Sequence, residues 1–117
     1  MKKIYYLSTC STCKRILSAL EIPSSFVLQD IKTNPLTEKE LEALKELSGS
    51  YEALFSKRAQ LYIERNLKRK SLIENDYKTL ILEHYTFLKR PVIIMDQFIF
   101  IGNAKATIEQ AKIKMHE

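Results

Sequence analysis

The chain has 117 residues, of which 45% are hydrophobic and 28% charged, with two glycines, three prolines and a formal net charge of +5. This composition predicts one soluble globular domain, residues 1–117, and excludes a disordered or low-complexity protein. The apolar run Ile4 to Leu7 is too short for a secretion signal or a membrane span, so no membrane contact and a cytoplasmic location are expected.

The excess positive charge lies in one segment, residues 57–70. This segment holds six basic residues and one acidic residue, which leaves thirteen of each sign among the chain's other residues. Such a run is usually a solvated helix face, although it can also receive an anionic partner. No recognisable nucleic-acid module accompanies it, so direct binding of DNA or RNA is not expected.

The first elements form a strand, a helix and a second strand. Lys3–Leu7 is the first predicted strand, and residues 25–31, "SFVLQDI", are the second. Between them, residues at the spacing of one helix face are Cys13, Ile16, Leu17 and Leu20. Ser11 or Thr12 is expected to cap this helix, with Cys10 at its tip. The order predicts a βαβ unit.

A helical region follows. Thr37 and Glu40 have the spacing of a capping box, and Gly49 supplies the stop of that helix. Further helical stretches are predicted over residues 51–55, 61–67 and 76–84. The segments "VIIM" and "FIFI", separated by Asp96-Gln97, then predict a β-hairpin, and a last helix opens after Gly102-Asn103. The fold class is α/β, with a mixed sheet covered by helices.

Cys10 and Cys13 are the only cysteines. A structural zinc site needs four ligands, and His84 and His116 are not spaced to complete one, so no metal is expected. A permanent disulfide between them would close a very small loop and constrain the unfolded chain little. Redox chemistry fits this pair best.

The first helix favours different roles for the two cysteines. Cys10 falls where unpaired backbone N–H groups carry partial positive charge, which favours the thiolate, and Lys14 and Arg15 add positive charge nearby. Cys13, one turn further on and facing inward, is placed to attack a mixed disulfide on Cys10. A Cys-x-x-Cys pair between a strand and a helix is typical of a thioredoxin-like redox motif.

After the cysteine pair, Arg90-Pro91 is the second sequence feature that indicates a functional site. Proline moves the preceding residue out of helical geometry, so a strand can start immediately after it. Arg90 is either an ordinary surface charge or, if it faces Cys10, a group that stabilises the thiolate and holds an anionic substrate.

These segments together resemble the arsenate reductase-like ArsC/Spx family of thioredoxin-fold proteins. "STCSTCKRI" is similar to the family's N-terminal catalytic loop, "ALFSKRAQLY" to the segment after its first inserted helices, and "FLKRPVII" with "FIFIGN" to its Arg-Pro strand and closing hairpin. The resemblance implies a thioredoxin-like fold, in which a four-stranded mixed sheet has a helical insertion between its second and third strands.

The resemblance also implies site residues. In glutaredoxin-dependent arsenate reductases of the family, one cysteine attacks arsenate and three arginines bind the oxyanion. Cys10 and Arg90 match that cysteine and one arginine, whereas Ser56 and Asn103 stand at the other two positions. Spx-like branches carry the full Cys-x-x-Cys and have an arginine two residues later, which Arg58 matches.

The sequence therefore predicts a thiol–disulfide oxidoreductase with Cys10 as nucleophile and Cys13 as resolving thiol. Arg90, Arg58 and Lys14 are predicted to bind an anionic or disulfide substrate, with Pro91 structural at the site. No bound cofactor is implied; glutathione, glutaredoxin or thioredoxin would supply electrons. The alternatives are an arsenate reductase that uses Cys10 alone, and an Spx-like redox-sensing regulator that binds RNA polymerase.

Overall fold

The computed structural model describes residues 1–117, and its contacts divide the chain into two compact units. The first, here called the sheet unit, combines Met1–Asn34 with Arg90–Glu117. The second, the helical unit, is Pro35–Lys89. The assignment of both units to one domain stays a prediction.

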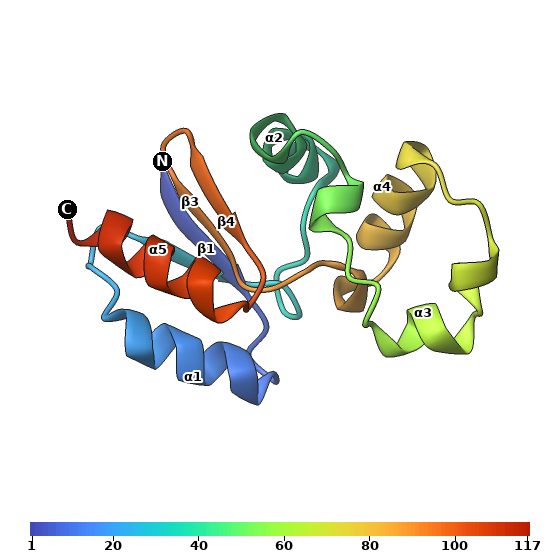
Figure 1. The fold of residues 1–117 in the computed structure, drawn as a ribbon. Helices are drawn as coiled ribbons and strands as arrows, with labels where there is room; N and C mark the ends of the chain where they lie inside the picture. Colours follow the sequence, from blue (N-terminus) through green and yellow to red (C-terminus); the bar gives the residue numbers. More distant parts are fainter. The chain divides into compact units, whose positions relative to one another are not determined.

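The sheet unit is a four-stranded mixed sheet with two helices (Figure 1). Its elements are β1 (Lys2–Tyr6), α1 (Ser11–Leu20), β2 (Val27–Asp30), β3 (Val92–Met95), β4 (Phe98–Ile101) and α5 (Lys105–Met115). The strand order is β2-β1-β3-β4, in which β1 and β2 are parallel and the other two pairs antiparallel. The predicted α/β class and the βαβ unit are confirmed.

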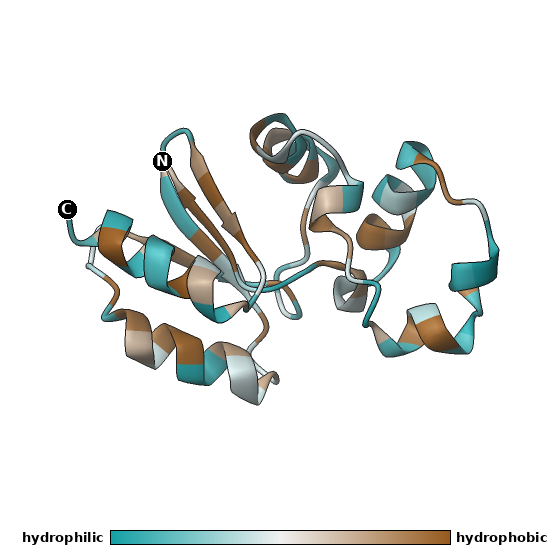
Figure 2. Ribbon diagram, in the orientation of Figure 1, coloured by the Kyte–Doolittle hydropathy of each residue, from teal (hydrophilic) through white to brown (hydrophobic).

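Helices α1 and α5 cover one face of this sheet because both present an apolar stripe to it (Figure 2). Ile4 of β1 and Ile93 of β3 lie opposite each other in register and are fully buried. The other buried members of this core are Ile16, Leu20, Phe26, Met95, Ala111 and Met115. Burying such side chains contributes about 1.5–3 kcal/mol for each large one.

Strand β2 is shorter than the predicted 25–31 and lies at the sheet edge. Val27 and Leu28, whose side chains point to opposite faces of the sheet, both remain exposed there. Gln29 is buried and donates a hydrogen bond from Nε2 to the Asn34 carbonyl (2.8 Å).

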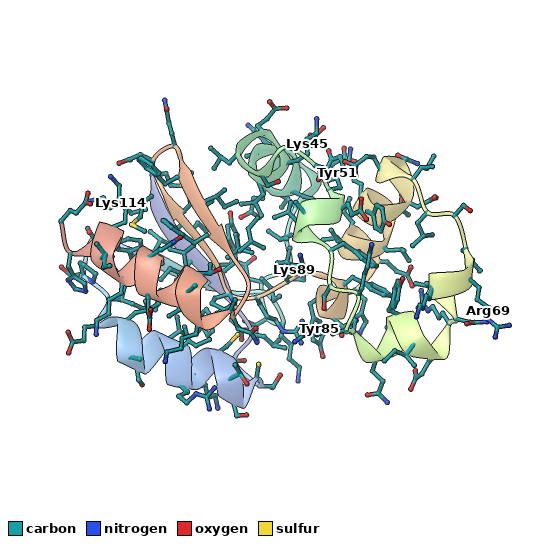
Figure 3. All side chains as sticks on the ribbon, viewed as in Figure 1. Lys45, Tyr51, Arg69, Tyr85, Lys89 and Lys114 are labelled. Carbon is teal, nitrogen blue, oxygen red and sulfur yellow. The ribbon has the colours of Figure 1, made fainter.

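The predicted hairpin is confirmed. Met95 pairs with Phe98 across the two-residue turn, and Asp96 adopts the left-handed conformation (φ 57°) that a tight hairpin turn requires. The ammonium of Lys114, which Figure 3 labels, lies 4.2 Å from the centroid of the Phe98 ring and ties the hairpin to the last helix.

The helical unit lies between β2 and β3 in the sequence, where the insertion was predicted. Its elements are α2 (Glu38–Ser48), α3 (Gln60–Glu64), α4 (Glu74–Glu83) and three 3₁₀ turns, η1 (Glu52–Leu54), η2 (Leu67–Arg69) and η3 (Tyr85–Phe87). The predicted helical stretch over 61–67 is confirmed up to Glu64, where α3 ends, and does not continue beyond it. Asn66 adopts the left-handed conformation (φ 54°), which asparagine tolerates and which ends the helical run.

Helix α2 begins with the predicted capping box. The Thr37 hydroxyl accepts the Glu40 N–H (3.1 Å), and the Glu40 carboxylate accepts the Thr37 N–H (3.1 Å). Gly49 ends the helix at φ 93°, where a residue with a Cβ would be strained.

Phe55 is the centre of an aromatic cluster in this unit, with ring contacts to Tyr62, Tyr77 and Phe87. Two of the basic residues of segment 57–70 pair with acids outside it: Lys57 with Glu52, and Arg65 with Glu83. The remaining four are exposed, and Figure 3 shows Arg69 extending away from the ribbon. The segment is therefore mainly a solvated surface.

Candidate active site

Cys10 occupies the N-cap position of α1, directly after the loop that leaves β1. Its backbone is extended (φ −94°, ψ 113°), its N–H donates to the Leu7 carbonyl (3.1 Å), and its carbonyl accepts the Lys14 N–H (3.1 Å) as the first bond of the helix. The expectation that Ser11 or Thr12 caps the helix is wrong, because Ser11 is already the first helical residue.

The Cys10 thiol is half-buried, and its surroundings favour the thiolate. Burial raises its pKa, but the Cys13 N–H, the Cys13 thiol, the Arg90 charge and the Thr12 N–H together outweigh burial and lower the pKa below its ordinary value. The side chain makes no capping hydrogen bond as a neutral thiol, as expected for a poor acceptor. The amides at the helix start thus become strong partners of the sulfur once it is ionised.

Cys13 lies one turn further along α1 and is fully buried. Burial, with an addition from the negative charge of Cys10, raises the pKa of its thiol to about 11, while the Leu7 amide and the Arg90 charge act in the opposite direction. Both cysteines are free thiols in this structure. The pair is therefore asymmetric: the half-buried sulfur of Cys10 has a lowered pKa, and the enclosed sulfur of Cys13 has a raised pKa.

Arg90 comes to this site because of the sheet register. Val92, at the start of β3, pairs antiparallel with Tyr5 near the end of β1. The residues before Val92 therefore lie at the end of the sheet where β1 leads into the loop before Cys10. The positive charge of Arg90 lowers the pKa of Cys10. Pro91 is fully buried, and the Arg90-Pro91 peptide bond is cis.

The other two predicted anion-binding residues have exposed side chains. Lys14 is exposed on the first turn of α1. Arg58 is exposed in the helical unit, where it lines an open cleft of about 500 Å³ with Ser56, Lys57 and Lys89 among others. The binding roles of Lys14 and Arg58 stay predictions.

Asp30 is a residue of this region that the sequence analysis missed. It ends β2, and its Oδ1 accepts the backbone N–H of Ser8 (3.1 Å) in the loop before Cys10. The hydroxyl and N–H of Ser8 hold the pKa of the Asp30 carboxyl below its usual value despite an opposing effect of desolvation. The sequence could have indicated Asp30, because it ends a strand that a βαβ unit makes parallel to β1. The carboxyl ends of two parallel strands lie at the same end of the sheet.

No group of three or more histidine, cysteine or acidic side chains in the chain is arranged to hold a metal ion. No helix is both long enough and apolar enough to cross a membrane.

Comparison with known proteins places this arrangement in a family. The sequence model of the ArsC family matches residues 5–111, which include both cysteines and Arg90. The chain belongs to the ArsC family. The sheet and insertion described above are the thioredoxin-like fold of that family, so the predicted family and fold are confirmed.

Individual relatives of the ArsC family point in two functional directions. The chain is similar to the global transcriptional regulator Spx 2 from Bacillus cereus, with 28% identity over 102 residues that cover 85% of this chain and 77% of the relative. It shares its fold with an ArsC family-related protein from Bacteroides fragilis (TM-score 0.77, 24% identity, 93% of this chain and 95% of that one). An arsenate reductase from Vibrio cholerae has the same fold (TM-score 0.71, 23% identity, 97% and 96% covered).

Proposed function

We propose that this ArsC family protein is a thiol–disulfide oxidoreductase in which Cys10 is the nucleophile and Cys13 the resolving thiol. The observation that carries the proposal is the position of the two sulfurs on one helical turn. Cys10 is half-buried at the helix N-cap and Cys13 is fully buried three residues later. An attacking thiol has to meet its substrate, whereas a resolving thiol has to meet only its neighbour.

In the first step, the Cys10 thiolate attacks one sulfur of a substrate disulfide. A mixed disulfide forms, and the other substrate sulfur leaves as a thiolate that takes a proton from water. The positive charge of Arg90 favours the attacking thiolate by lowering the pKa of Cys10 and would also hold an anionic substrate.

In the second step, Cys13 loses its proton and attacks the Cys10 sulfur, and the second substrate sulfur leaves. The Cys10 charge is one of the causes that raise the pKa of Cys13, and that charge disappears once Cys10 is in a mixed disulfide. Cys13 is therefore easier to ionise after the first step than before it. The protein has lost two electrons and the substrate has gained two.

The cycle needs a thiol reductant to reopen the Cys10–Cys13 disulfide. Glutathione, glutaredoxin or thioredoxin would supply the two electrons, which fits a reducing compartment such as the cytoplasm. Arg58 and Lys14 are proposed as further binding groups for an anionic substrate, and Pro91 as a structural residue beside the site.

The test is turnover of hydroxyethyl disulfide with reduced glutathione, together with a redox titration read by mass spectrometry. The wild type is expected to turn over and to form an internal Cys10–Cys13 disulfide. Cys10→Ser should be inactive. Given hydroxyethyl disulfide without glutathione, Cys13→Ser should stop as a mixed disulfide of Cys10 with the substrate, because no second thiol is present to resolve it. If no internal disulfide forms at any potential that glutathione can reach, the two-cysteine mechanism is wrong.

Arsenate reduction by Cys10 alone would give a different pattern. Thiol-coupled reduction of arsenate would survive Cys13→Ser and disappear in Cys10→Ser. Neutral residues, Ser56 and Asn103, stand at two of the three arginine positions of the family's arsenate reductases, which favours the disulfide substrate over the oxyanion.

A redox-sensing regulator that binds RNA polymerase is the second candidate, and the 28% identical Spx relative favours it. The same Cys10–Cys13 disulfide would then be a switch. Oxidant-sensitive binding of purified RNA polymerase, without measurable disulfide turnover, would support the regulator over the enzyme.

A further inference from the structure

We propose that Asp30 is a positioning residue that holds the loop before Cys10 in the geometry the two thiols need. This inference rests on the proposed function, since it concerns the reactivity of the same cysteine pair. Its basis is a chain of backbone contacts that leads from the end of β2 to the N-cap of α1.

The contacts begin where the β1–β2 pairing ends. Tyr6 and Asp30 are the last residues in register, and the Ile31 N–H donates to the Tyr6 carbonyl (2.9 Å). Beyond that point the Asp30 side chain replaces the backbone as acceptor, because its Oδ1 takes the Ser8 N–H at 3.1 Å. The carboxylate thus extends the pairing of the two strands by one more hydrogen bond.

The Ser8 N–H belongs to the same peptide group as the Leu7 carbonyl. That carbonyl accepts the Cys10 N–H at 3.1 Å and closes a turn over Leu7 to Cys10. A peptide group is planar, so a hydrogen bond at one end fixes the direction of the other. Asp30 therefore sets the orientation of the carbonyl that holds the Cys10 backbone.

The same loop also contacts the second sulfur. The Leu7 amide is one of the groups that act on the Cys13 thiol and lower its pKa. The Leu7 N–H belongs to the Tyr6–Leu7 peptide, whose carbonyl accepts the Ile31 N–H, one peptide group before the one that Asp30 holds. A shift of the loop at Leu7 and Ser8 would change the surroundings of both sulfurs together. Asp30 touches neither sulfur, so its effect on them passes through the loop.

Asp30 also holds the turn that follows β2. Its Oδ1 accepts the Lys32 N–H (3.2 Å), and its Oδ2 accepts the Thr33 hydroxyl (3.3 Å). A variant at Asp30 therefore alters two turns, and the experiment has to separate them. Thr33→Val removes only the hydroxyl contact and leaves the contact with Ser8, which makes it the first control.

Asp96 offers a second, matched control. It is an exposed carboxylate of the same unit whose pKa is also lowered, in this case by the N-terminal ammonium at 2.9 Å. It follows β3 in the hairpin turn and has no hydrogen bond to the loop before Cys10. Asp96→Ala should lose its contact with the N-terminus and leave both cysteines unchanged.

The experiment measures two rates in each variant by mass spectrometry. The first is alkylation of Cys10 by iodoacetamide as a function of pH. The second is closure of the Cys10–Cys13 disulfide from a mixed disulfide of Cys10 with glutathione. Asp30→Ala is expected to move the alkylation midpoint to higher pH and to slow closure about ten- to a hundred-fold, the scale expected when reacting groups are misplaced by 1 Å.

Asp30→Asn should recover part of both effects, because its amide oxygen can still accept the Ser8 N–H. Thr33→Val and Asp96→Ala should match the wild type. If Asp30→Ala does not fold, Asp30→Glu decides, since its longer side chain keeps the charge and misplaces the carboxylate: slowed closure supports the proposal, and wild-type closure overturns it.

A folded Asp30→Ala with the wild-type midpoint and closure rate also overturns the proposal. If the wild type itself fails to close the disulfide, the proposed function fails. The alkylation midpoint of Asp30→Ala then still decides whether Asp30 positions the Cys10 loop.

Discussion

Helices α1 and α2 differ in how their first turns are capped, although each has a pair of key residues at the N-cap and three positions later. In α2, Thr37 is the N-cap and Glu40 lies three residues later, and each side chain caps the backbone of the other. In α1, Cys10 is the N-cap and Cys13 lies three residues later, with no capping hydrogen bond and no acidic residue in the first turn. The Cys-x-x-Cys pair thus occupies the two positions of a capping box.

The start of α1 lacks the stabilisation that side-chain capping gives to α2. A threonine or aspartate at an N-cap stabilises a helix by about 1 kcal/mol over a residue that does not cap. In α2 the unpaired N–H groups are used in that way. In α1 they remain available to a thiolate, and acidic side chains that would repel it are absent. The difference between the two helices is a trade of stability for reactivity.

Cys10→Asp should have the largest effect among the variants that test this difference. An aspartate caps well, so the variant should be more stable than the wild type by about 0.5–1 kcal/mol in urea unfolding at neutral pH. Its disulfide turnover should fall to the level of the blank because no nucleophilic sulfur remains. Residual turnover, or a loss of stability in this variant, would contradict the account of the α1 start.

The buried sulfur predicts a loss of stability at high pH. The folded chain keeps the proton of Cys13 up to a pKa of about 11, whereas an unperturbed thiol releases it near 9.0. The free energy of unfolding should therefore fall between these pH values, by up to about 3 kcal/mol at 1.36 kcal/mol per unit.

The measurement is urea unfolding of the wild type and of Cys13→Ala from pH 8 to about pH 11. Other groups titrate in this range in both proteins, so the difference between the two curves reports on Cys13. Parallel curves would show that Cys13 ionises as easily in the folded chain as in the unfolded one.

At the start of α2, Thr37→Ala should destabilise the protein by about 1 kcal/mol. The unfolding temperature should fall by about 3–5 °C, as expected for a chain of this size. Scanning calorimetry measures the change, and the alkylation midpoint of Cys10 should stay where it is, because Thr37 belongs to another helix. A shift of that midpoint would mean that the two helix starts are not independent.

Arg90→Gln is expected to act on reactivity more than on stability. Its charge is one cause of the lowered pKa of Cys10, so its removal should raise that pKa and slow alkylation at neutral pH by several-fold. Lys14→Ala is the control from the exposed face of α1 and should slow alkylation less. Equal effects of the two variants would mean that the positive charge of Lys14 favours the Cys10 thiolate as much as that of Arg90 does.

Local signals in the sequence predicted much of the fold. Thr37, Glu40 and Gly49 determine where α2 begins and ends through contacts within a few residues, and the structure has them as predicted. The hairpin at Asp96-Gln97 and the helix after Cys10 follow from local patterns in the same way. The break at Asn66 was missed because an apolar pattern continues through it and only the backbone conformation of one residue ends the helix.

Contacts distant in the sequence could not be predicted from such patterns. The hydrogen bond between Ser8 and Asp30 spans 22 residues and depends on the register of β1 with β2. The approach of Arg90 to Cys10 depends likewise on the pairing of β3 with β1. From the sequence alone, the role of Arg90 depended on whether it faces Cys10. The pairing of β3 with β1 brings Arg90 close enough for its charge to act on Cys10.

The most direct test of the central claim is an ultraviolet titration of thiolate absorbance in the wild type, with Cys10→Ser and Cys13→Ser as references. We expect a first ionisation below the pKa of a free cysteine that disappears in Cys10→Ser. A second ionisation, well above that pKa, should disappear in Cys13→Ser. A single ionisation at the free-cysteine pKa for both residues would contradict the claim that the start of α1 is built for a thiolate.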